Sequence, residues 1–500
     1  MSDSLRPSEP PRTSLVDLAE WLGADVGGPV DGVVVTGVSL SSQRVRPGDL
    51  YAALPGARAH GIDFAADAVA AGAVAILTDP AGAARSTAGV PLLVVEHPRA
   101  VLGRLAARIY GEPARAMRMI GVTGTQGKTT TTRLLESGLQ LAGVPAAVIG
   151  TVGTRMVGID VKTALTTPEA PDLHGLFAVM RERGVAACAM EVSSHALVMG
   201  RVDGVVFDVA VFLNLGRDHL DFHADLEDYF AAKASLFTPE RARLALVNVD
   251  DEHGRRLLNE ATVPVRTFSA AGADADWRAT DVELRAEGSA FVITTPSGER
   301  LSAGCSLPGD FNVANTLAAV AAAGEAGLDA GLVAAGIADG GGVPGRLERV
   351  DAGQDFVVVV DYAHKPDAVA AAIRTLRPLT PGRVIVVLGA GGERDPGKRP
   401  MMAAIAADLA DVLVITDDNP RTEDPTTIRA AMLAGISDPA AEVLEIGDRR
   451  TAIQRALRLA APGDIVLIAG KGHESGQEVD GVVHPFDDRD VAREELACLR

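Results

Sequence analysis

A glycine-rich turn near residue 120 separates an apolar stretch from a helical pattern. Residues 121–130 read Gly-Val-Thr-Gly-Thr-Gln-Gly-Lys-Thr-Thr; the apolar stretch Met117–Val122 leads into them, and the helical pattern after them runs to Gly143. A strand, a glycine loop and a helix in this order cradle phosphate groups, because backbone N–H groups and the positive end of the helix dipole face the same point. The chain is therefore expected to bind a nucleoside triphosphate.

Two side chains of this loop could also bind the phosphates and their metal ion. Lys128 can reach the β- and γ-phosphates, and the Thr129 hydroxyl can ligate Mg²⁺. The glycines recur every third residue from Gly121, whereas the general phosphate-loop pattern would place its first glycine at Val122. The loop residues expected to hold ATP are Gly124, Thr125, Gln126, Gly127, Lys128, Thr129 and Thr130.

Charge and composition exclude several classes of protein. The formal net charge of −19 argues against binding to nucleic acid or to anionic membranes, which require a basic surface. The segment Met1–Ser14 is polar and rich in proline, and no apolar run approaches the roughly 20 residues of a membrane span. We therefore expect a cytoplasmic protein without a membrane or nucleic-acid partner. We also expect the protein to be a monomer.

The length of 500 residues corresponds to about three domains. A hydrophobic content of 47% with only 4% aromatic residues suits cores of Ala, Val and Leu, as in α/β proteins. The expected domains are residues 1–115, residues 116–343 with the phosphate loop, and residues 344–500. The run Gly340–Gly345 is the expected linker before the third domain.

In the third domain, apolar stretches alternate with helical patterns, which indicates parallel strands joined by helices. The expected strands are Phe356–Val360, Val384–Leu388, Val412–Ile415, Val443–Ile446 and Ile465–Ile468. A polar loop follows each strand, so these loops should gather at the carboxyl edge of the sheet. Open α/β sheets bind their ligands at that edge.

Two polar clusters in the central domain also follow apolar stretches. They are Glu-Val-Ser-Ser-His at 191–195 and Asn-Leu-Gly-Arg-Asp-His-Leu-Asp at 214–221. Glu191 and His219 could meet over the phosphate loop and hold Mg²⁺, although imidazole is an unusual ligand for this ion. The alternative is that both residues only cap strands or pair with neighbours.

Two other residues have an ordinary and a specific interpretation. Lys233 lies in the helical stretch Leu226–Phe237, where the pattern alone indicates a solvated lysine. Asn312 opens an alanine-rich helix, where it is either an N-cap or a contact to adenine.

Taken together, these motifs resemble the Mur ligases, the ATP-dependent amide-bond ligases that build the peptidoglycan stem peptide. The resemblance spans nearly the whole chain. It rests on the two polar clusters above and on Gly-Thr-Gln-Gly-Lys-Thr-Thr at 124–130, Thr-Thr-Pro at 166–168, Asn312, Pro-Gly-Arg at 344–346 and Asp-Tyr-Ala-His at 361–364. Asp-Asn-Pro-Arg at 418–421 resembles the signature of members that add meso-diaminopimelate. A guanidinium can hold the carboxylate that lysine lacks.

The resemblance implies both a reaction and a fold. The reaction joins meso-2,6-diaminopimelate to UDP-N-acetylmuramoyl-L-alanyl-D-glutamate through an acyl phosphate, with ATP and Mg²⁺ as cofactors. The implied α/β fold has a first domain that binds the UDP-muramoyl peptide, a central P-loop ATPase domain and a Rossmann-like C-terminal domain that binds the amino acid.

The resemblance also implies roles for single residues. Lys128, Glu191, His219 and Lys233 would be catalytic, and Thr129, Glu191, His219 and Lys233 as a carbamate would surround the metal. Asn312 and Arg346 would contact ATP. The UDP-muramoyl dipeptide would be held by Leu40, Ser42, Thr166, Thr167, Ser193 and Arg201, and diaminopimelate by Arg394, Asp418, Asn419, Pro420, Arg421, Gly470 and Glu474.

The chain departs from the family pattern at three places. Gln126 stands where asparagine is usual, Met199 stands where glutamine is frequent, and residues 41–43 read Ser-Ser-Gln instead of Asp-Ser-Arg. Three other functions stay open: a lysine-adding sibling, a ligase similar to folylpolyglutamate synthase, and a non-catalytic ATP-binding regulator. Arg421 and Glu474 argue against lysine, the full first domain argues against folate, and the intact catalytic set argues against a regulator.

Overall fold

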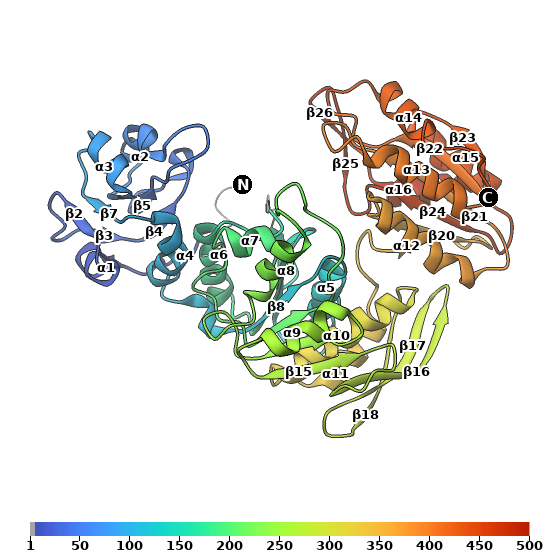
Figure 1. Cartoon of the computed structure of the whole chain (residues 1–500), viewed down its shortest axis with the longest axis horizontal. Helices are drawn as coiled ribbons and strands as arrows, with labels where there is room; N and C mark the ends of the chain where they lie inside the picture. Colours follow the sequence, from blue (N-terminus) through green and yellow to red (C-terminus); the bar gives the residue numbers. More distant parts are fainter. Residues whose placement is uncertain (1–5, 162, 164, 500) are drawn as a thin grey trace. The chain divides into compact units, whose positions relative to one another are not determined.

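The computed structural model describes residues 6–161, 163 and 165–499 (Figure 1). These residues fall into two compact units. Unit 1 is the described part of Met1–Arg278 with Thr294–Glu299 and Leu317–Gly336. Unit 2 is the described part of Ala279–Ile293, Arg300–Thr316 and Ile337–Arg500. Among the described residues, no helix combines the length and the apolar character that crossing a membrane requires.

The first part of unit 1 is a small α/β layer structure. Its five-stranded sheet has the order β2-β7-β6-β5-β4, with only β2 antiparallel to its neighbour. The strands are β2 Asp25–Gly27, β4 Gly37–Ser39, β5 Asp49–Ala52, β6 Ala75–Thr78 and β7 Leu92–Val94. The helices are α1 Leu15–Leu22, α2 Ala65–Ala70, α3 Pro80–Arg85 and α4 Pro98–Ile109.

The apolar stretch Gly32–Val38 forms two short strands rather than one. Its first half is β3 (Val34–Val35), which pairs with β1 (Thr13–Ser14), and its second half is β4. The interruption falls at Thr36, whose N–H donates to the carbonyl of Gly48 at 2.9 Å. At the next position, a Cβ on Gly37 would lie 2.2 Å from the Arg6 guanidinium, so this close approach requires glycine.

The phosphate loop belongs to the larger sheet of unit 1. Within unit 1 the strand order is β11-β10-β9-β12-β8-β13-β14-β15 followed by the first two residues of β16, and from β9 onward each strand is parallel to the next. Their bounds are β8 Arg118–Thr123, β9 Ala146–Gly150, β10 Gly153–Met156, β11 Ile159–Val161, β12 Ala187–Glu191, β13 Val209–Phe212, β14 Ala245–Asn248, β15 Val265–Ser269 and β16 Trp277–Arg285. The helices are α5 Lys128–Leu141, α6 Ala170–Glu182, α7 Ser194–Val198, α8 Leu226–Ala234 and α9 Glu252–Glu260.

Unit 2 contains the sheet expected in the third domain. The order is β19-β20-β24-β21-β22-β23, parallel except for β19. The strands are β19 Glu348–Arg349, β20 Val357–Asp361, β21 Val384–Ala390, β22 Val412–Asp417, β23 Glu442–Glu445 and β24 Ile465–Ala469, so all five expected strands are confirmed. The helices are α12 Pro366–Leu376, α13 Lys398–Leu409, α14 Pro425–Leu433, α15 Arg449–Leu459 and α16 Asp488–Cys498.

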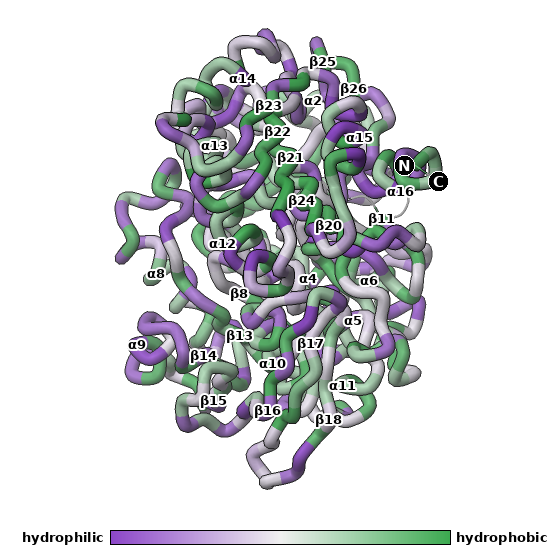
Figure 2. The backbone as a smooth tube through the Cα atoms, turned by 90° about the vertical axis from the view of Figure 1, so that its right-hand side faces the viewer, coloured by the Kyte–Doolittle hydropathy of each residue, from purple (hydrophilic) through white to green (hydrophobic). Residues whose placement is uncertain are grey.

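Both faces of this sheet are covered, which explains its nearly continuous apolar strands (Figure 2). One set of alternating residues, such as Val386 and Leu413, packs with α12, α13 and α14. The intervening set, such as Val387 and Val414, packs with α15 and α16.

The remaining elements lie between the two sheets in the sequence, except for a hairpin that follows β24. They are the strands β17 Gly288–Thr294 and β18 Arg300–Cys305, the helices α10 Asp310–Glu325 and α11 Ala330–Asp339, and the hairpin of β25 Gly476–Val479 with β26 Val482–Pro485.

A histidine buried in the core of unit 1 should make stability depend on pH. His174 on α6 is fully buried, and its Nε2 lies 3.1 Å from the carbonyl oxygen of Asp203. Burial lowers its pKa from 6.5 to about 4. Above pH 6.5 the ring is neutral in both states; below it only the unfolded chain gains the proton, so stability falls towards pH 4 by about 3 kcal/mol.

His174→Gln keeps a donor for the Asp203 carbonyl and removes this titration. We expect denaturant unfolding of the variant to show a shallower loss of stability between pH 6.5 and pH 4. His97→Gln, at an exposed position, is the matched control. Parallel pH profiles for His174→Gln and wild type would contradict the prediction.

Candidate active site

The phosphate loop has the geometry that its sequence predicts. Strand β8 ends at Thr123 and helix α5 begins at Lys128. Between them Gly124 and Gly127 take φ values of 157° and 86°, which favour glycine. The Lys128 Nζ lies over its own loop, 2.7 Å from the carbonyl oxygen of Gly124. The loop therefore presents backbone N–H groups, a helix N-terminus and an amine at one place.

Glu191 contacts this loop directly, as the sequence predicts. It ends strand β12, is 1% exposed, and accepts a hydrogen bond from the Thr129 hydroxyl at 2.9 Å. The backbone N–H of Thr151 donates to the same oxygen at 2.8 Å, and the Thr151 hydroxyl donates to the other at 3.1 Å. A Cβ on Gly150 would lie 2.2 Å from the carboxylate. Thr151 was not predicted as a site residue, since nothing in its own sequence context marks it.

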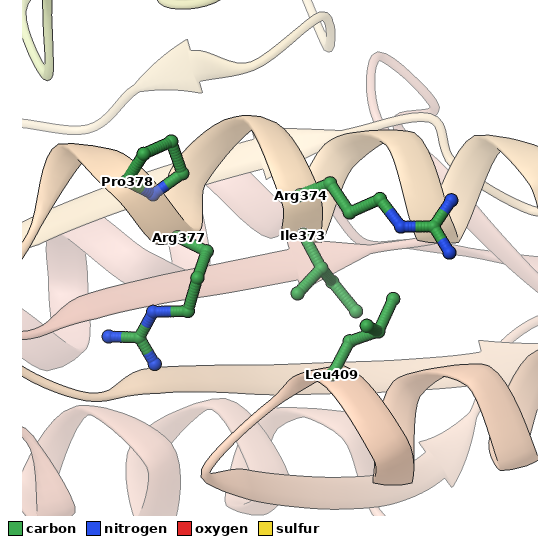
Figure 3. A pocket seen from close by; sticks show the side chains of 5 residues that line it. All are labelled: Ile373, Arg374, Arg377, Pro378 and Leu409. Atoms are coloured by element: carbon green, nitrogen blue, oxygen red, sulfur yellow. The ribbon is translucent and has the colours of Figure 1, made fainter.

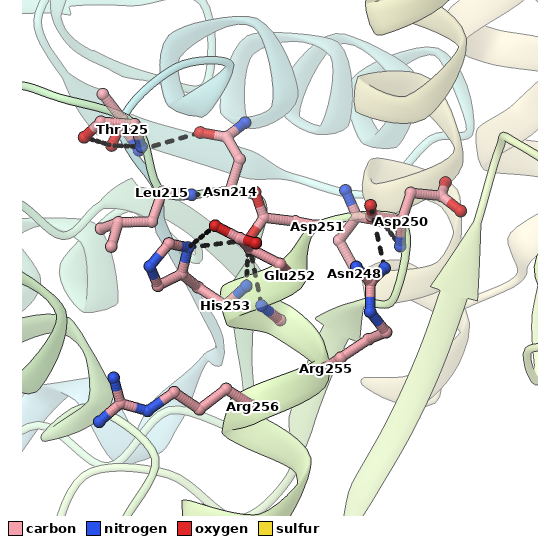
Figure 4. Close-up of polar contacts among 12 residues, drawn as sticks. Thr125, Asn214, Leu215, Asn248, Asp250, Asp251, Glu252, His253, Arg255 and Arg256 are labelled. Carbon is pink, nitrogen blue, oxygen red and sulfur yellow. Dashed lines mark hydrogen bonds and ion pairs between the residues drawn. The ribbon is translucent and has the colours of Figure 1, made fainter.

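The loop is also held from the end of strand β13 (Figure 4). The Asn214 side-chain oxygen accepts from the N–H groups of Thr125 and Gln126 at 3.1 and 3.0 Å. Its Nδ2 donates to the Gln126 carbonyl at 3.2 Å. The next residue, Leu215, donates its N–H to the Asp251 carboxylate at 3.3 Å. Asn214 thus fixes the conformation of the phosphate loop, a role that the motif at 214–221 alone does not reveal.

Lys233 is not the solvated helix lysine that its local pattern indicates. It lies on α8, is 1% exposed, and its Nζ donates to the Gly124 carbonyl at 2.9 Å. The same amine lies 4.5 Å from the centre of the Tyr229 ring. Burial lowers the pKa of Lys233 well below its usual value, and Lys128 lowers it further while Asp218 opposes the shift. Burial therefore favours the neutral form of this amine, which faces the phosphate loop.

His219 lies near the same loop but packs against other rings. Its φ is 55°, and its imidazole meets the His195 ring edge-on with 4.8 Å between centres. The centre of the Tyr229 ring lies 6.0 Å from that of the His219 ring. Within the described part of the chain, no three His, Cys, Asp or Glu side chains converge where they could hold a metal ion. A magnesium site here would need other ligands as well.

The residues expected to hold the muramoyl peptide partly surround Glu191. The Thr166 and Thr151 hydroxyls are 3.1 Å apart, and the Thr167 hydroxyl donates to the Glu191 carbonyl at 2.8 Å. Ser193 caps α7 through a bond from the Ala196 N–H. Arg201 donates through Nε to Glu169 at 2.8 Å. Leu40 directly follows β4, and Ser42 begins a short 3-10 helix two residues later.

In unit 2, the polar loops gather at the carboxyl edge of the six-stranded sheet, as predicted. The Asn419 amide donates to the Glu474 carboxylate at 2.8 Å. Lys471, which was not among the predicted site residues, is fully buried. Its Nζ donates to Asn419 at 2.9 Å and to Glu474 at 3.1 Å. Gly470 has a φ of 117°, and a Cβ there would lie 2.5 Å from the Asp418 carboxylate.

Arg421 occupies the turn after these residues. Its φ is 56°, its Nε lies 3.3 Å from Glu478 Oε2, and its backbone N–H donates to the Glu478 carbonyl at 3.0 Å. Pro420 precedes it, and Arg394 is exposed in the turn after β21. The hairpin of β25 and β26 thus holds an arginine beside the cluster of Asn419, Lys471 and Glu474.

The other two residues expected to contact ATP also lie in unit 2. Asn312 is the third residue of α10, so the interpretation as an N-cap is wrong. It is buried and donates to the Pro308 carbonyl at 2.8 Å. The Arg346 guanidinium lies 4.7 Å from the centre of the Tyr362 ring.

An apolar cavity of about 200 Å³ in unit 2 lies elsewhere (Figure 3). It is lined by Ile373, Arg374, Arg377, Pro378 and Leu409, at the C-terminal ends of α12 and α13. Arg377 pairs there with Asp411, which precedes strand β22. These positions lie at the amino edge of the sheet, opposite the carboxyl edge where the polar loops gather. The cavity is therefore not part of the candidate site.

Comparison with known families identifies the class of protein. The model described as Mur ligase family, catalytic domain, matches residues 34–110. The Mur ligase middle domain matches residues 122–323, and the glutamate ligase domain of the same family matches residues 345–472. The chain belongs to the Mur ligase family and has its three-domain α/β fold. It is an ATP-dependent ligase.

Several full-length relatives of the chain carry the name of one particular Mur ligase. The chain is 56% identical over 497 residues to the UDP-N-acetylmuramoyl-L-alanyl-D-glutamate–2,6-diaminopimelate ligase of Streptomyces coelicolor, which covers 98% of both chains. It is 48% identical over 504 residues to the ligase of the same name from Corynebacterium glutamicum, covering 96% of this chain and 97% of that one. A solved structure of a ligase with this name superposes with a TM-score of 0.71 at 34% identity, covering 98% and 99% of the two chains.

Proposed function

We propose that this chain joins meso-diaminopimelate to the D-glutamate of UDP-N-acetylmuramoyl-L-alanyl-D-glutamate during peptidoglycan precursor synthesis. The observation that carries the proposal is the 56% identity, over 98% of both chains, to a ligase named for this reaction. The interpretation of the sequence as a diaminopimelate-adding Mur ligase is thereby confirmed. We further propose the cytoplasm, where ATP is available, as its place of action, a monomer as its form, and domains at 1–115, 116–343 and 344–500.

The proposed reaction has two steps. A D-glutamate carboxylate oxygen attacks the γ-phosphorus of ATP, ADP leaves, and an acyl phosphate forms. The diaminopimelate amine then attacks the acyl carbon, loses a proton, and expels inorganic phosphate. Negative charge accumulates in both transition states, so nearby cations and N–H donors should accelerate them. The loop Gly124–Thr130 and the Lys128 amine supply such groups next to Glu191.

A magnesium ion fits the oxygen atoms that converge at this place. The Thr129 hydroxyl and the Glu191 carboxylate are 2.9 Å apart and buried, and Mg²⁺ prefers hard oxygen ligands. When bound, this ion would neutralise phosphate charge. We propose Thr129, Glu191, His219 and carbamylated Lys233 as the residues that surround it.

The chemistry of Lys233 supports carbamylation. Only a neutral amine adds to CO₂, and burial next to Lys128 favours the neutral form. The nitrogen forms a bond to the carbon of CO₂ and releases one proton, so the side chain becomes an anion. That anion would offset the Lys128 charge and would give the site an additional oxygen donor.

The remaining contacts are proposed by residue. Asn312 and Arg346 contact ATP, and Leu40, Ser42, Thr166, Thr167, Ser193 and Arg201 contact the UDP-muramoyl dipeptide. For diaminopimelate, the Glu474 carboxylate suits an amino group, and the Arg394 and Arg421 guanidinium groups suit carboxylates. Asp418, Asn419, Pro420 and Gly470 complete that site.

Phosphate release tests the reaction and its amino-acid specificity together. Purified protein is given ATP, Mg²⁺ and UDP-N-acetylmuramoyl-L-alanyl-D-glutamate, with meso-diaminopimelate in one tube and L-lysine in another. We expect rapid turnover with diaminopimelate and only weak turnover with lysine. Preference for lysine would overturn the specificity, and no turnover in either tube would overturn the substrate assignment.

A further inference from the structure

A fully buried ion pair lies behind the loops at the carboxyl edge of the unit 2 sheet. It joins Arg449, the first residue of α15, to Asp488, the first residue of α16, and both side chains are 0% exposed. Arg449 Nε donates to Asp488 Oδ1 at 2.7 Å, and Nη2 donates to Oδ2 at 2.6 Å. Neither residue has a role in the reaction proposed above.

The same guanidinium also binds the ends of two strands. Arg449 Nη2 donates to the Ala469 carbonyl at 3.0 Å, and Nη1 donates to the Asp417 carbonyl at 3.4 Å. Ala469 is the last residue of β24 and Asp417 is the last residue of β22. The next residues in the chain are Gly470 and Asp418, both of which belong to the proposed diaminopimelate site. One side chain therefore links the starting points of two substrate loops.

The fit between these two loops leaves little room for displacement. A Cβ on Gly470 would lie 2.5 Å from the Asp418 carboxylate, so the two chains approach closely. The loops then continue to Asn419, Lys471 and Glu474, which are joined by hydrogen bonds of 2.8 to 3.1 Å. A shift of either strand end would therefore move several proposed substrate contacts together, which would weaken the binding of diaminopimelate.

We propose that Arg449 and Asp488 are a positioning pair for the amino-acid site. Arg449 holds the strand ends before Asp418 and Gly470 at a fixed separation, and Asp488 holds the guanidinium in the required orientation. A buried pair of this kind is no requirement for stability, since apolar residues of similar volume often replace such a pair without loss. The inference rests on the proposed function, which assigns these loops to diaminopimelate.

The deciding variant removes the pair and fills the space. Arg449→Met with Asp488→Leu leaves no uncompensated charge, so we expect it to fold with a thermal midpoint near that of wild type. We expect its KM for diaminopimelate to rise about 10-fold or more, because the loops lose their common anchor. The KM for ATP and kcat should stay within about twofold. A folded double variant with an unchanged KM for diaminopimelate would overturn the positioning role.

The control is the neighbouring arginine. Arg450 pairs with Glu494 and Glu495 on α16 but is half exposed and makes no such contact to a strand end, so Arg450→Met should leave all KM values unchanged. If the double variant fails to fold, Arg449→Lys tests the positioning role instead. Lysine keeps the positive charge but lacks the planar guanidinium group that binds Asp488 and the strand ends together. A raised KM for diaminopimelate in this variant supports the proposal, and an unchanged KM overturns it.

Amide hydrogen exchange separates this inference from the proposed function. In the double variant, the loops 418–421 and 470–474 should exchange faster than in wild type, whatever substrate the enzyme uses. Unchanged exchange would overturn the positioning role even without an activity assay. A wild-type enzyme that fails to use diaminopimelate would instead count against the proposed function alone.

Discussion

Lys233→Ala is expected to reduce kcat by about 10²- to 10³-fold, the usual effect of removing one charged group from a transition state. Alanine cannot carry a carbamate, so the proposed metal site loses an oxygen donor. The structure makes this prediction specific, since the Lys233 amine is buried and faces the Gly124 carbonyl rather than solvent. Phosphate release at saturating substrates measures the change.

Acetate or another small carboxylate should restore part of the lost activity, because it can occupy the space of the missing carbamate. A ¹³C NMR signal after addition of ¹³C-bicarbonate should be present in wild type and absent from the variant. Arg243→Ala, at an exposed ion pair in the same unit, is the control and should retain full activity. Full activity of Lys233→Ala would exclude the carbamate, and loss of activity without any rescue would favour a purely structural lysine.

The parallel strands of the unit 2 sheet were predictable from the sequence for a physical reason. They are buried on both faces, so they are nearly continuous runs of Val, Ile and Leu, such as Val384–Ala390. The strands β16 and β18 have no such runs. Most of Trp277–Arg285 is exposed and carries charged residues, so its pattern resembles a loop. Only its pairing with neighbouring strands makes it a strand.

Some residues of the candidate site were also predictable from the sequence, and others were not. The loop Gly124–Thr130 was predictable because glycine spacing, lysine and threonine act within one turn of chain. Lys233 could also have been found as buried, because Tyr229 and Phe230 lie four and three positions before it on the same apolar helix face. Thr151 gave no signal, since its contact with Glu191 spans 40 positions of sequence. Contacts of this range depend on the assembled sheet.

The buried pair of Arg449 and Asp488 could not be predicted from the local sequence either. Asp488 stands in the run Asp487–Asp490, which has the composition of a solvated turn. Its neighbour Asp487 does cap α16 through the Arg489 N–H, as such a run predicts. Nothing local distinguishes the aspartate that is fully buried, because its partner lies 39 positions away.

Arg421→Ala is expected to raise the KM for diaminopimelate roughly 10- to 100-fold, the range of a lost charge-assisted hydrogen bond. The KM for ATP should change by less than about twofold. Arg421 is already oriented before substrate binds, because its backbone pairs with Glu478 and its Nε lies 3.3 Å from the Glu478 carboxylate. Initial rates over a range of each substrate give both constants.

Activity with lysine as the substrate shows whether Arg421 binds the second carboxylate of diaminopimelate or only supports the fold. Lysine has no second carboxylate, so Arg421→Ala should lower kcat/KM for diaminopimelate and leave the weak use of lysine unchanged. Arg421→Lys keeps a charge but loses the fork, so its KM for diaminopimelate should fall between wild type and alanine. Arg493→Ala, on the exposed side of α16, is the control. Equal effects on diaminopimelate, lysine and ATP would mean that Arg421 supports the hairpin of β25 and β26 instead of reading the substrate.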